Sequence, residues 1–127
     1  MNLFIFSLIM TGIFSLTMIG FGLLFTKKAP KNINYIVGYR TQMSMKNKET
    51  WKFAHLYAGK MWMFSGLMTL IISTVLVVVL RKSAHYNQFM LILFYIQIII
   101  LLLVIPFTEV ALRKTFDKNG NKKDSKE

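Results

Sequence analysis

Residues 61–80, MWMFSGLMTLIISTVLVVVL, form an uninterrupted run of twenty residues without a charged side chain. A helix of about 20 apolar residues crosses the roughly 30 Å hydrocarbon core of a bilayer, so this run has the length of a membrane span. Two other runs share its character: Leu3–Phe25 holds no charge, and Phe89–Leu112 holds only Glu109. The chain is therefore predicted to be an all-α integral membrane protein with three transmembrane helices.

Lysine and arginine are distributed unevenly among the segments that flank these runs. Of 16 such residues, eight lie in residues 26–60, two in residues 81–88 and six in residues 113–127. Loops rich in Lys and Arg stay in the cytoplasm. Three spans place the first loop and the C-terminal segment on the same side. Charge and parity thus both predict a multi-pass protein of the cell membrane with its N-terminus outside and its C-terminus in the cytoplasm.

The formal net charge of +11 does not by itself indicate nucleic acid. Most of this charge flanks the spans, where basic residues meet anionic headgroups, so the expected partner is the lipid bilayer and not a nucleic acid. Residues 1–116 are expected to form one three-span domain. Residues 117–127 are polar and basic, without apolar side chains, and are expected to be a disordered tail.

The first loop, residues 26–60, contains too many aromatic side chains to be a simple linker. Ser44 or Asn47 can cap a helix there, because their side chains accept hydrogen bonds from free backbone N–H groups. At 100° per residue, a set of small and aromatic side chains then gathers on one side: Trp51, Ala54, His55, Ala58, Gly59 and Trp62. We expect a cytoplasmic amphipathic helix that leads into the second span, straight or bent at Gly59 or Gly66.

The same loop carries a spaced pattern, VGYRTxxSMKNxxxWxxxHxxxGK over residues 37–60. This pattern resembles the signature of the SdpI family, which runs G-x-R-T, S-x-x-N, W and G-K ahead of a membrane span. The candidate binding residues that the resemblance implies are Gly38, Arg40, Thr41, Ser44, Asn47, Trp51, His55 and Gly59. The best-known family member gives bacteria immunity to the secreted sporulation-delay toxin SdpC.

The resemblance implies a protein that protects its host membrane from a secreted toxin or peptide, by binding it or by blocking its action. It also allows signalling, in which the cytoplasmic loop captures a repressor. The alternative is a small accessory or transport subunit of a membrane complex, with Gln97, Pro106 and Glu109 lining a solute path. A homo-oligomer would fit either function.

Each motif residue also has a structural interpretation. Gly38 can adopt positive φ at a sharp turn. Arg40 can bind a lipid phosphate, an acid or a partner. Trp51 is expected to be an interfacial anchor or a partner contact, and His55 a packed side chain. Gly59 is expected to let a neighbouring helix approach closely.

The third span contains two polar side chains that need partners. Gln97, near its middle, is expected to bond a neighbouring helix. Glu109 is expected to pair with Arg113, one helical turn away, with Arg40 as a competing partner. Catalytic patterns are missing from the sequence: it has no H-E-x-x-H, no glycine-rich phosphate loop and no cysteine. We therefore expect no enzyme, no metal site and no cofactor.

The orientation is tested by single cysteines, since the chain has none of its own. A cysteine at Ser83 should react with an impermeant maleimide added to intact cells, and one at Ser125 should react only after lysis. The charge bias of the loops is the physical reason. The reverse labelling pattern would invert the topology.

Overall fold

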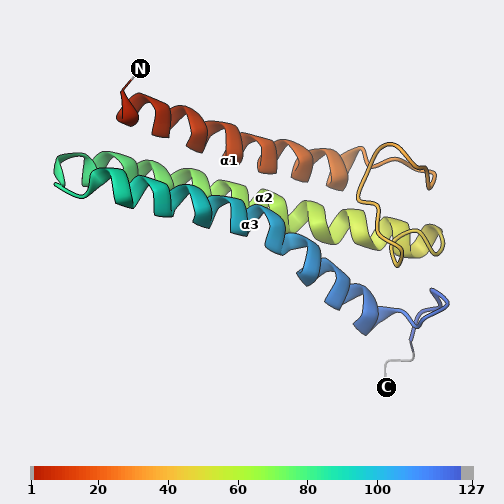
Figure 1. Ribbon diagram of the computed structural model, residues 1–127. Helices are drawn as coiled ribbons and strands as arrows, with labels where there is room; N and C mark the ends of the chain where they lie inside the picture. The colour runs from red at the N-terminus through yellow and green to blue at the C-terminus, as the bar shows by residue number, and fades with distance from the viewer. Residues whose placement is uncertain (1, 124–127) are drawn as a thin grey trace.

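The computed structural model describes residues 2–123 as three long helices, with a short 3-10 helix between the second and the third. Helix α1 covers Leu3–Lys27, α2 covers Lys48–Val79 and α3 covers Tyr86–Thr115, and η1 spans Leu80–Lys82. The three lie side by side and alternate in direction (Figure 1). Each is long and apolar enough to cross a membrane, which confirms the all-α, three-span prediction.

Helix α2 is a single helix that begins well before its apolar run. Asn47 caps it: the Asn47 side chain accepts from the Thr50 N–H at 2.9 Å, and the Thr50 hydroxyl accepts from the Asn47 N–H at 3.0 Å. This reciprocal capping box satisfies two otherwise free donors. The helical segment expected ahead of the second span is thus continuous with it. Neither Gly59 nor Gly66 interrupts the helix.

The interior of the bundle mixes small and polar side chains with apolar ones such as Val77 and Leu112, and its exterior is apolar. The buried face of α1 contains Ser7, Thr11, Ser15, Met18, Gly22 and Phe25. Large apolar side chains such as Leu16, Phe64 and Ile71 face outward and are at least half exposed. Helices in lipid gain no hydrophobic energy from packing on one another, so small residues that allow close contact line their interfaces.

Glycines mark the closest contacts between α1 and α2. A Cβ built on Gly22 would lie 2.7 Å from the Gly59 carbonyl oxygen, and one on Gly59 would lie 2.9 Å from the Gly22 carbonyl oxygen. Gly66 meets the α1 backbone in the same way, 3.0 Å from the Ile19 nitrogen. The close approach expected at Gly59 is therefore present, and α1 is its neighbour.

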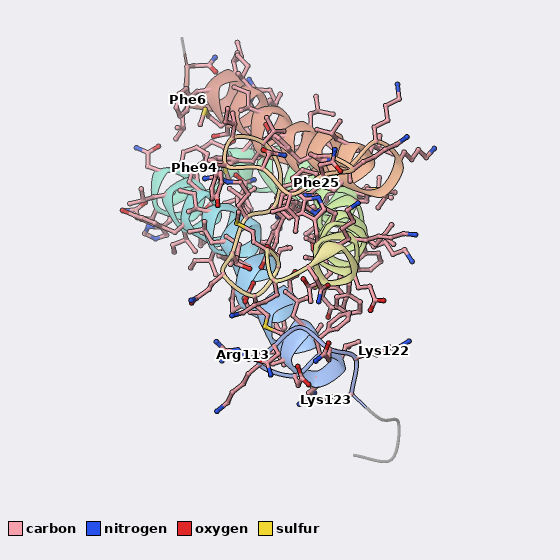
Figure 2. The ribbon with its side chains drawn as sticks, turned by 90° about the vertical axis from the view of Figure 1, so that its right-hand side faces the viewer. Phe6, Phe25, Phe94, Arg113, Lys122 and Lys123 are labelled. Atoms are coloured by element: carbon pink, nitrogen blue, oxygen red, sulfur yellow. The ribbon has the colours of Figure 1, made fainter. Side chains whose placement is uncertain are left out.

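The end of α1, the start of α2 and the end of α3 lie at the same end of the bundle, here called the basic end (Figure 1). Figure 2 looks onto this end, where Phe25 lies among the helices and Arg113 lies near the C-terminal segment. Helix α3 contains Pro106, and its last turns diverge from α2 (Figure 1). Proline removes a backbone donor and clashes with the preceding turn, which bends helices at such positions.

The C-terminal segment differs from the disordered tail that was expected. Residues 117–123 form a turn in which the Lys123 N–H donates to the Thr115 carbonyl at 2.9 Å. The Asn47 amide holds this turn by donating to the Gly120 carbonyl at 2.6 Å, and Gly120 has φ 84°. A glycine at positive φ and a long-range side-chain bond order the turn without apolar packing. Residues 124–127 lie outside the described residues.

The glycine contacts predict a sharp difference between two neighbouring positions of α1. Gly22→Ala should lower the free energy of unfolding by about 1–3 kcal/mol, because its methyl group would overlap the α2 backbone. Gly20→Ala is the matched control: nothing lies within 4 Å of its built Cβ, and alanine favours the helix. Steric-trap unfolding in bicelles measures both. Equal stabilities would contradict this packing.

Candidate functional site

The motif residues between Thr41 and Thr50 build the turn that leads into α2. The Ser44 hydroxyl accepts from the Thr41 N–H at 2.8 Å, and the Ser44 N–H donates to the Thr41 hydroxyl at 3.1 Å. The Thr50 hydroxyl lies 3.0 Å from the Ser44 carbonyl, its acceptor. Ser44 therefore shapes the turn, and Asn47 alone caps the helix. These short polar side chains replace the backbone partners that an irregular segment lacks.

His55 connects this loop to α2. Its Nε2 accepts from the Tyr39 N–H at 2.9 Å, and its Nδ1 lies 2.8 Å from the Trp51 carbonyl oxygen. A carbonyl can only accept, so Nδ1 carries the proton and Nε2 is left free to accept. His55 is fully buried. It is thus a packed side chain that satisfies a loop backbone donor inside the protein.

Gly38 is required where the loop passes over His55. Its φ is 118°, and a Cβ there would lie 2.6 Å from the His55 Nε2 atom and 3.1 Å from the Trp51 ring. Both the backbone conformation and the lack of space exclude a side chain. The positive φ expected at Gly38 is therefore present.

Trp51 is only 2% exposed. Its ring centroid lies 4.3 Å from that of His55, and its Nε1 donates to the Pro30 carbonyl at 2.6 Å. The interpretation of Trp51 as an interfacial anchor is thus wrong, because loop residues cover the ring and take up its donor. The sequence did not reveal Pro30 as the partner, since a proline carbonyl carries no local signal.

Tyr39 extends the loop's contacts to α3. Its hydroxyl donates to the Glu109 carboxylate at 2.8 Å, and the Ile105 carbonyl lies 3.1 Å away. Burial raises the pKa of the Tyr39 hydroxyl above its usual range, and the bond to Glu109 and the negative charge of that carboxylate raise it further. The hydroxyl therefore keeps its proton and remains a donor to the acid.

The expected ion pairs of Glu109 are not formed. Within residues 2–123 its carboxylate pairs with neither Arg113 nor Arg40, and its bonding partner is Tyr39. Arg40 is exposed. Sequence reasoning missed Tyr39 because the partner lies 70 residues away from Glu109. The signal that could have found it is a tyrosine directly after the turn glycine, in the loop that lies on the same side of the membrane as the Glu109 end of the third span.

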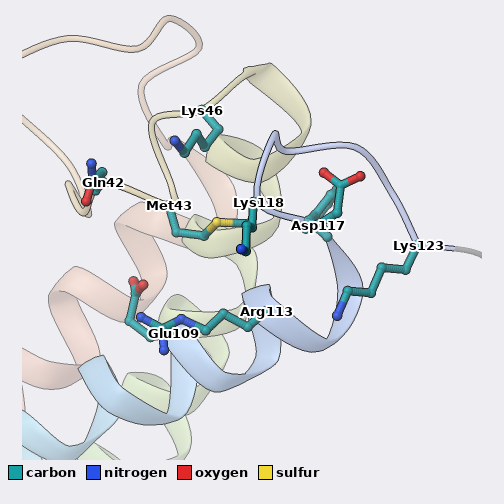
Figure 3. A pocket seen from close by; sticks show the side chains of 9 residues that line it. Gln42, Met43, Lys46, Glu109, Arg113, Asp117, Lys118 and Lys123 are labelled. Atoms are coloured by element: carbon teal, nitrogen blue, oxygen red, sulfur yellow. The ribbon is translucent and has the colours of Figure 1, made fainter. Parts of the chain in front are cut away.

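A cavity of about 710 Å³ lies beside Glu109. Figure 3 shows that its walls come from the loop, from α3 and from the C-terminal turn. Its charged lining residues are Lys46, Glu109, Arg113, Asp117, Lys118 and Lys123. Acids and bases are mixed there. Among residues 2–123, no three His, Asp or Glu side chains are placed to hold a metal ion.

Deeper in the bundle, Gln97 bonds a neighbouring helix as expected. Its amide donates to the Thr11 hydroxyl at 3.0 Å, which joins α3 to α1. Gln97, Thr11, Ser7 and Ser15 are all essentially unexposed. Polar side chains in a bilayer contribute by such bonds between helices, because lipid offers them no alternative partner.

Comparison with known proteins finds one family whose model covers most of the ordered loop, all of α2 and most of α3. The SdpI/YfhL protein family matches residues 31–108, more than half of the chain. The chain belongs to the SdpI/YfhL family. The uncharacterized protein YfhL of Bacillus subtilis (strain 168) is 38% identical to it over 47 residues, which are 37% of this chain. That match spans 43% of the length of YfhL. No solved structure matches the chain.

The part that matches the SdpI/YfhL family includes all eight motif residues and Gln97, and it ends one residue before Glu109. The structure brings five motif residues into one connected cluster on the loop and the start of α2: Gly38, Thr41, Ser44, Trp51 and His55. Gly59 lies one turn further along α2, against α1. Arg40 points away from the cluster into the surroundings. In this SdpI/YfhL chain the motif therefore serves chiefly to hold the loop on the helices.

The contact between loop and α3 is tested by removing one hydroxyl. Tyr39→Phe should lower the free energy of unfolding by about 1.5–3 kcal/mol, because the Glu109 carboxylate loses its donor. Tyr35→Phe is the control, since that side chain is 85% exposed. Steric-trap unfolding in bicelles reports both variants. If they are equally stable, the Tyr39 bond does not hold the loop.

Proposed function

We propose that this SdpI/YfhL-family protein is an immunity protein that protects a bacterial membrane from a secreted toxin or peptide. The family match over residues 31–108 supports the proposal. The observation that carries its mechanism is the inward orientation of the motif: Trp51, His55 and Ser44 are buried and bonded to the chain itself. These side chains are therefore not available to a toxin, and protection would depend on exposed residues such as Arg40, with one protein bound to each toxin.

An exposed apolar turn supports a second role within the same proposal. Asn34 accepts from the N–H groups of Ile36 and Val37 at 2.9 and 2.7 Å, which fixes the turn. Tyr35 and Ile36 at its tip are 85% and 88% exposed. Large apolar side chains held out by a bonded turn are typical of contacts with a partner. On the proposed cytoplasmic side, this turn would capture a soluble repressor.

The geometry gives less support to an accessory or transport subunit. That role requires Gln97, Pro106 and Glu109 to face one path. Gln97 is bonded to α1, Glu109 is bonded to the loop and Pro106 lies on the exposed surface of α3. Within one chain these three side chains therefore do not line a common solute path.

Toxin challenge tests the proposal. Expression of the chain should raise the survival of a sensitive bacterium exposed to a secreted peptide of the sporulation-delay type, in proportion to the amount of protein. Arg40→Ala should weaken protection without lowering the amount in the membrane, because Arg40 is exposed. Lys114→Ala is the matched control, an exposed residue with the same charge that lies outside the motif.

Two outcomes would refute this function. Survival that stays unchanged at high expression across a panel of such toxins would exclude immunity. Full protection at trace expression would exclude binding in a one-to-one ratio. The repressor role has its own readout: Ile36→Asp should release a captured regulator and leave toxin survival unchanged.

A further inference from the structure

A second cavity lies at the basic end, between the last turn of α1 and the first turns of α2. Its volume is about 440 Å³. Figure 1 shows the two helix ends side by side, with the loop leaving α1 next to them. This cavity shares no lining residue with the one beside Glu109. It is therefore a separate cavity, which meets the motif cluster only at Trp51 and which the proposed function does not use.

Four lysines from two separate segments surround this cavity. Lys27 and Lys31 come from the end of α1 and the residues after it, and Lys48 and Lys52 come from successive turns of α2. All four are exposed, and no Asp or Glu is among the lining residues. Like charges gathered around one space repel each other unless an anion neutralises them. The cavity beside Glu109 differs, because Glu109 and Asp117 balance part of its charge.

The structure holds these lysines together in advance. The Trp51 Nε1 atom donates to the Pro30 carbonyl at 2.6 Å, which fixes the segment after α1 against α2. Lys31 follows Pro30 directly, and Lys48 and Lys52 flank Trp51 on its own helix. The bond from the buried Trp51 ring thus fixes the backbone from which these lysines extend. A prearranged set of donors binds an anion with a smaller entropic cost.

Apart from Thr26, the rest of the lining is apolar, and it lies next to the end of the apolar run of α1. Phe25 is the last residue of the apolar run of α1, and it lines the cavity together with Leu56 and Trp51. A soluble phosphate would use only the lysines. A phospholipid would use both parts, with its phosphate among the lysines and its glycerol and first methylene groups against the apolar side chains.

We propose that this cavity binds the headgroup of an anionic phospholipid. The lysines neutralise the phosphate of a headgroup that carries no cation of its own, and the apolar side chains contact the upper part of the acyl chains. Basic residues near a membrane surface attract anionic lipid in general. The proposal is more specific, because it assigns binding to these four lysines and not to the other basic residues of the chain.

Lipid retention by the purified full-length protein tests this assignment. Native mass spectrometry from detergent would count bound phosphatidylglycerol, phosphatidylcholine and inorganic phosphate separately. Phosphatidylglycerol should be retained about tenfold more strongly than phosphatidylcholine. The double variant Lys48→Gln, Lys52→Gln should lose this preference. Lys46→Gln, Lys118→Gln is the matched control, which removes the same charge from the cavity beside Glu109 and should keep the preference.

Three results would overturn the proposal. Equal losses in the two double variants would assign retention to overall charge. Inorganic phosphate that binds the wild-type chain and displaces phosphatidylglycerol at equal concentration would make this a site for free phosphate. Lys27→Gln, Lys31→Gln is the corresponding double variant on the α1 side of the cavity. If both double variants still retain phosphatidylglycerol, the lipid does not bind in this cavity. These lysines are exposed, so circular dichroism of the variants should match the wild type.

Discussion

The hydrogen bond from the Tyr39 N–H to the buried Nε2 of His55 is the interaction on which the architecture of the basic end depends. It joins an irregular loop to a helix face across sixteen residues of sequence, in a place that water does not reach. A buried backbone N–H without an acceptor is costly, so the loop keeps this position only while His55 presents a free nitrogen. The Trp51 carbonyl ensures that, because it accepts a hydrogen bond from the Nδ1–H group and so keeps the proton on Nδ1. The turn of α2 from Trp51 to His55 therefore determines both the tautomer of the His55 ring and the position of the loop.

Several other contacts follow from that bond. It places Tyr39 so that its hydroxyl reaches Glu109 on α3, which ties the loop to the helix that diverges after Pro106. It also requires Gly38, since any side chain there would overlap His55. On the other side of the same cluster, Trp51 fixes Pro30 and so brings two pairs of lysines around one cavity. The motif is thus buried for structural reasons, and the surfaces that it leaves open are the apolar turn at Tyr35 and Ile36, the side chain of Arg40 and the lysine cavity.

In the membrane-spanning part the usual distribution of side chains is reversed. Serine, threonine, glycine and glutamine face inward together with a few apolar residues such as Met90 and Val104, and most large aliphatic and aromatic residues face outward. Lipid solvates the outward side chains as well as a protein core would, so helix association relies on close contact and on polar bonds. The glycine contacts of α1 with α2 provide the first, and the bond from Gln97 to Thr11 provides the second.

The sequence by itself determined the three spans, the all-α class, the helical start of α2 and the family. Each of these depends on local information: the length of an apolar run, a capping residue such as Asn47, or the spacing of a motif. The sequence also indicated that Gln97 needed a partner on another helix and that Gly59 would meet a neighbour. Only the tertiary structure decided which residues those partners were. Glu109 bonds Tyr39 and not Arg113, Trp51 is enclosed and not at the interface, and the turn at Gly120 is ordered by Asn47. These contacts join residues far apart in the chain, and their choice depends on the distance between helices and on the direction of each side chain, which periodicity and composition do not encode.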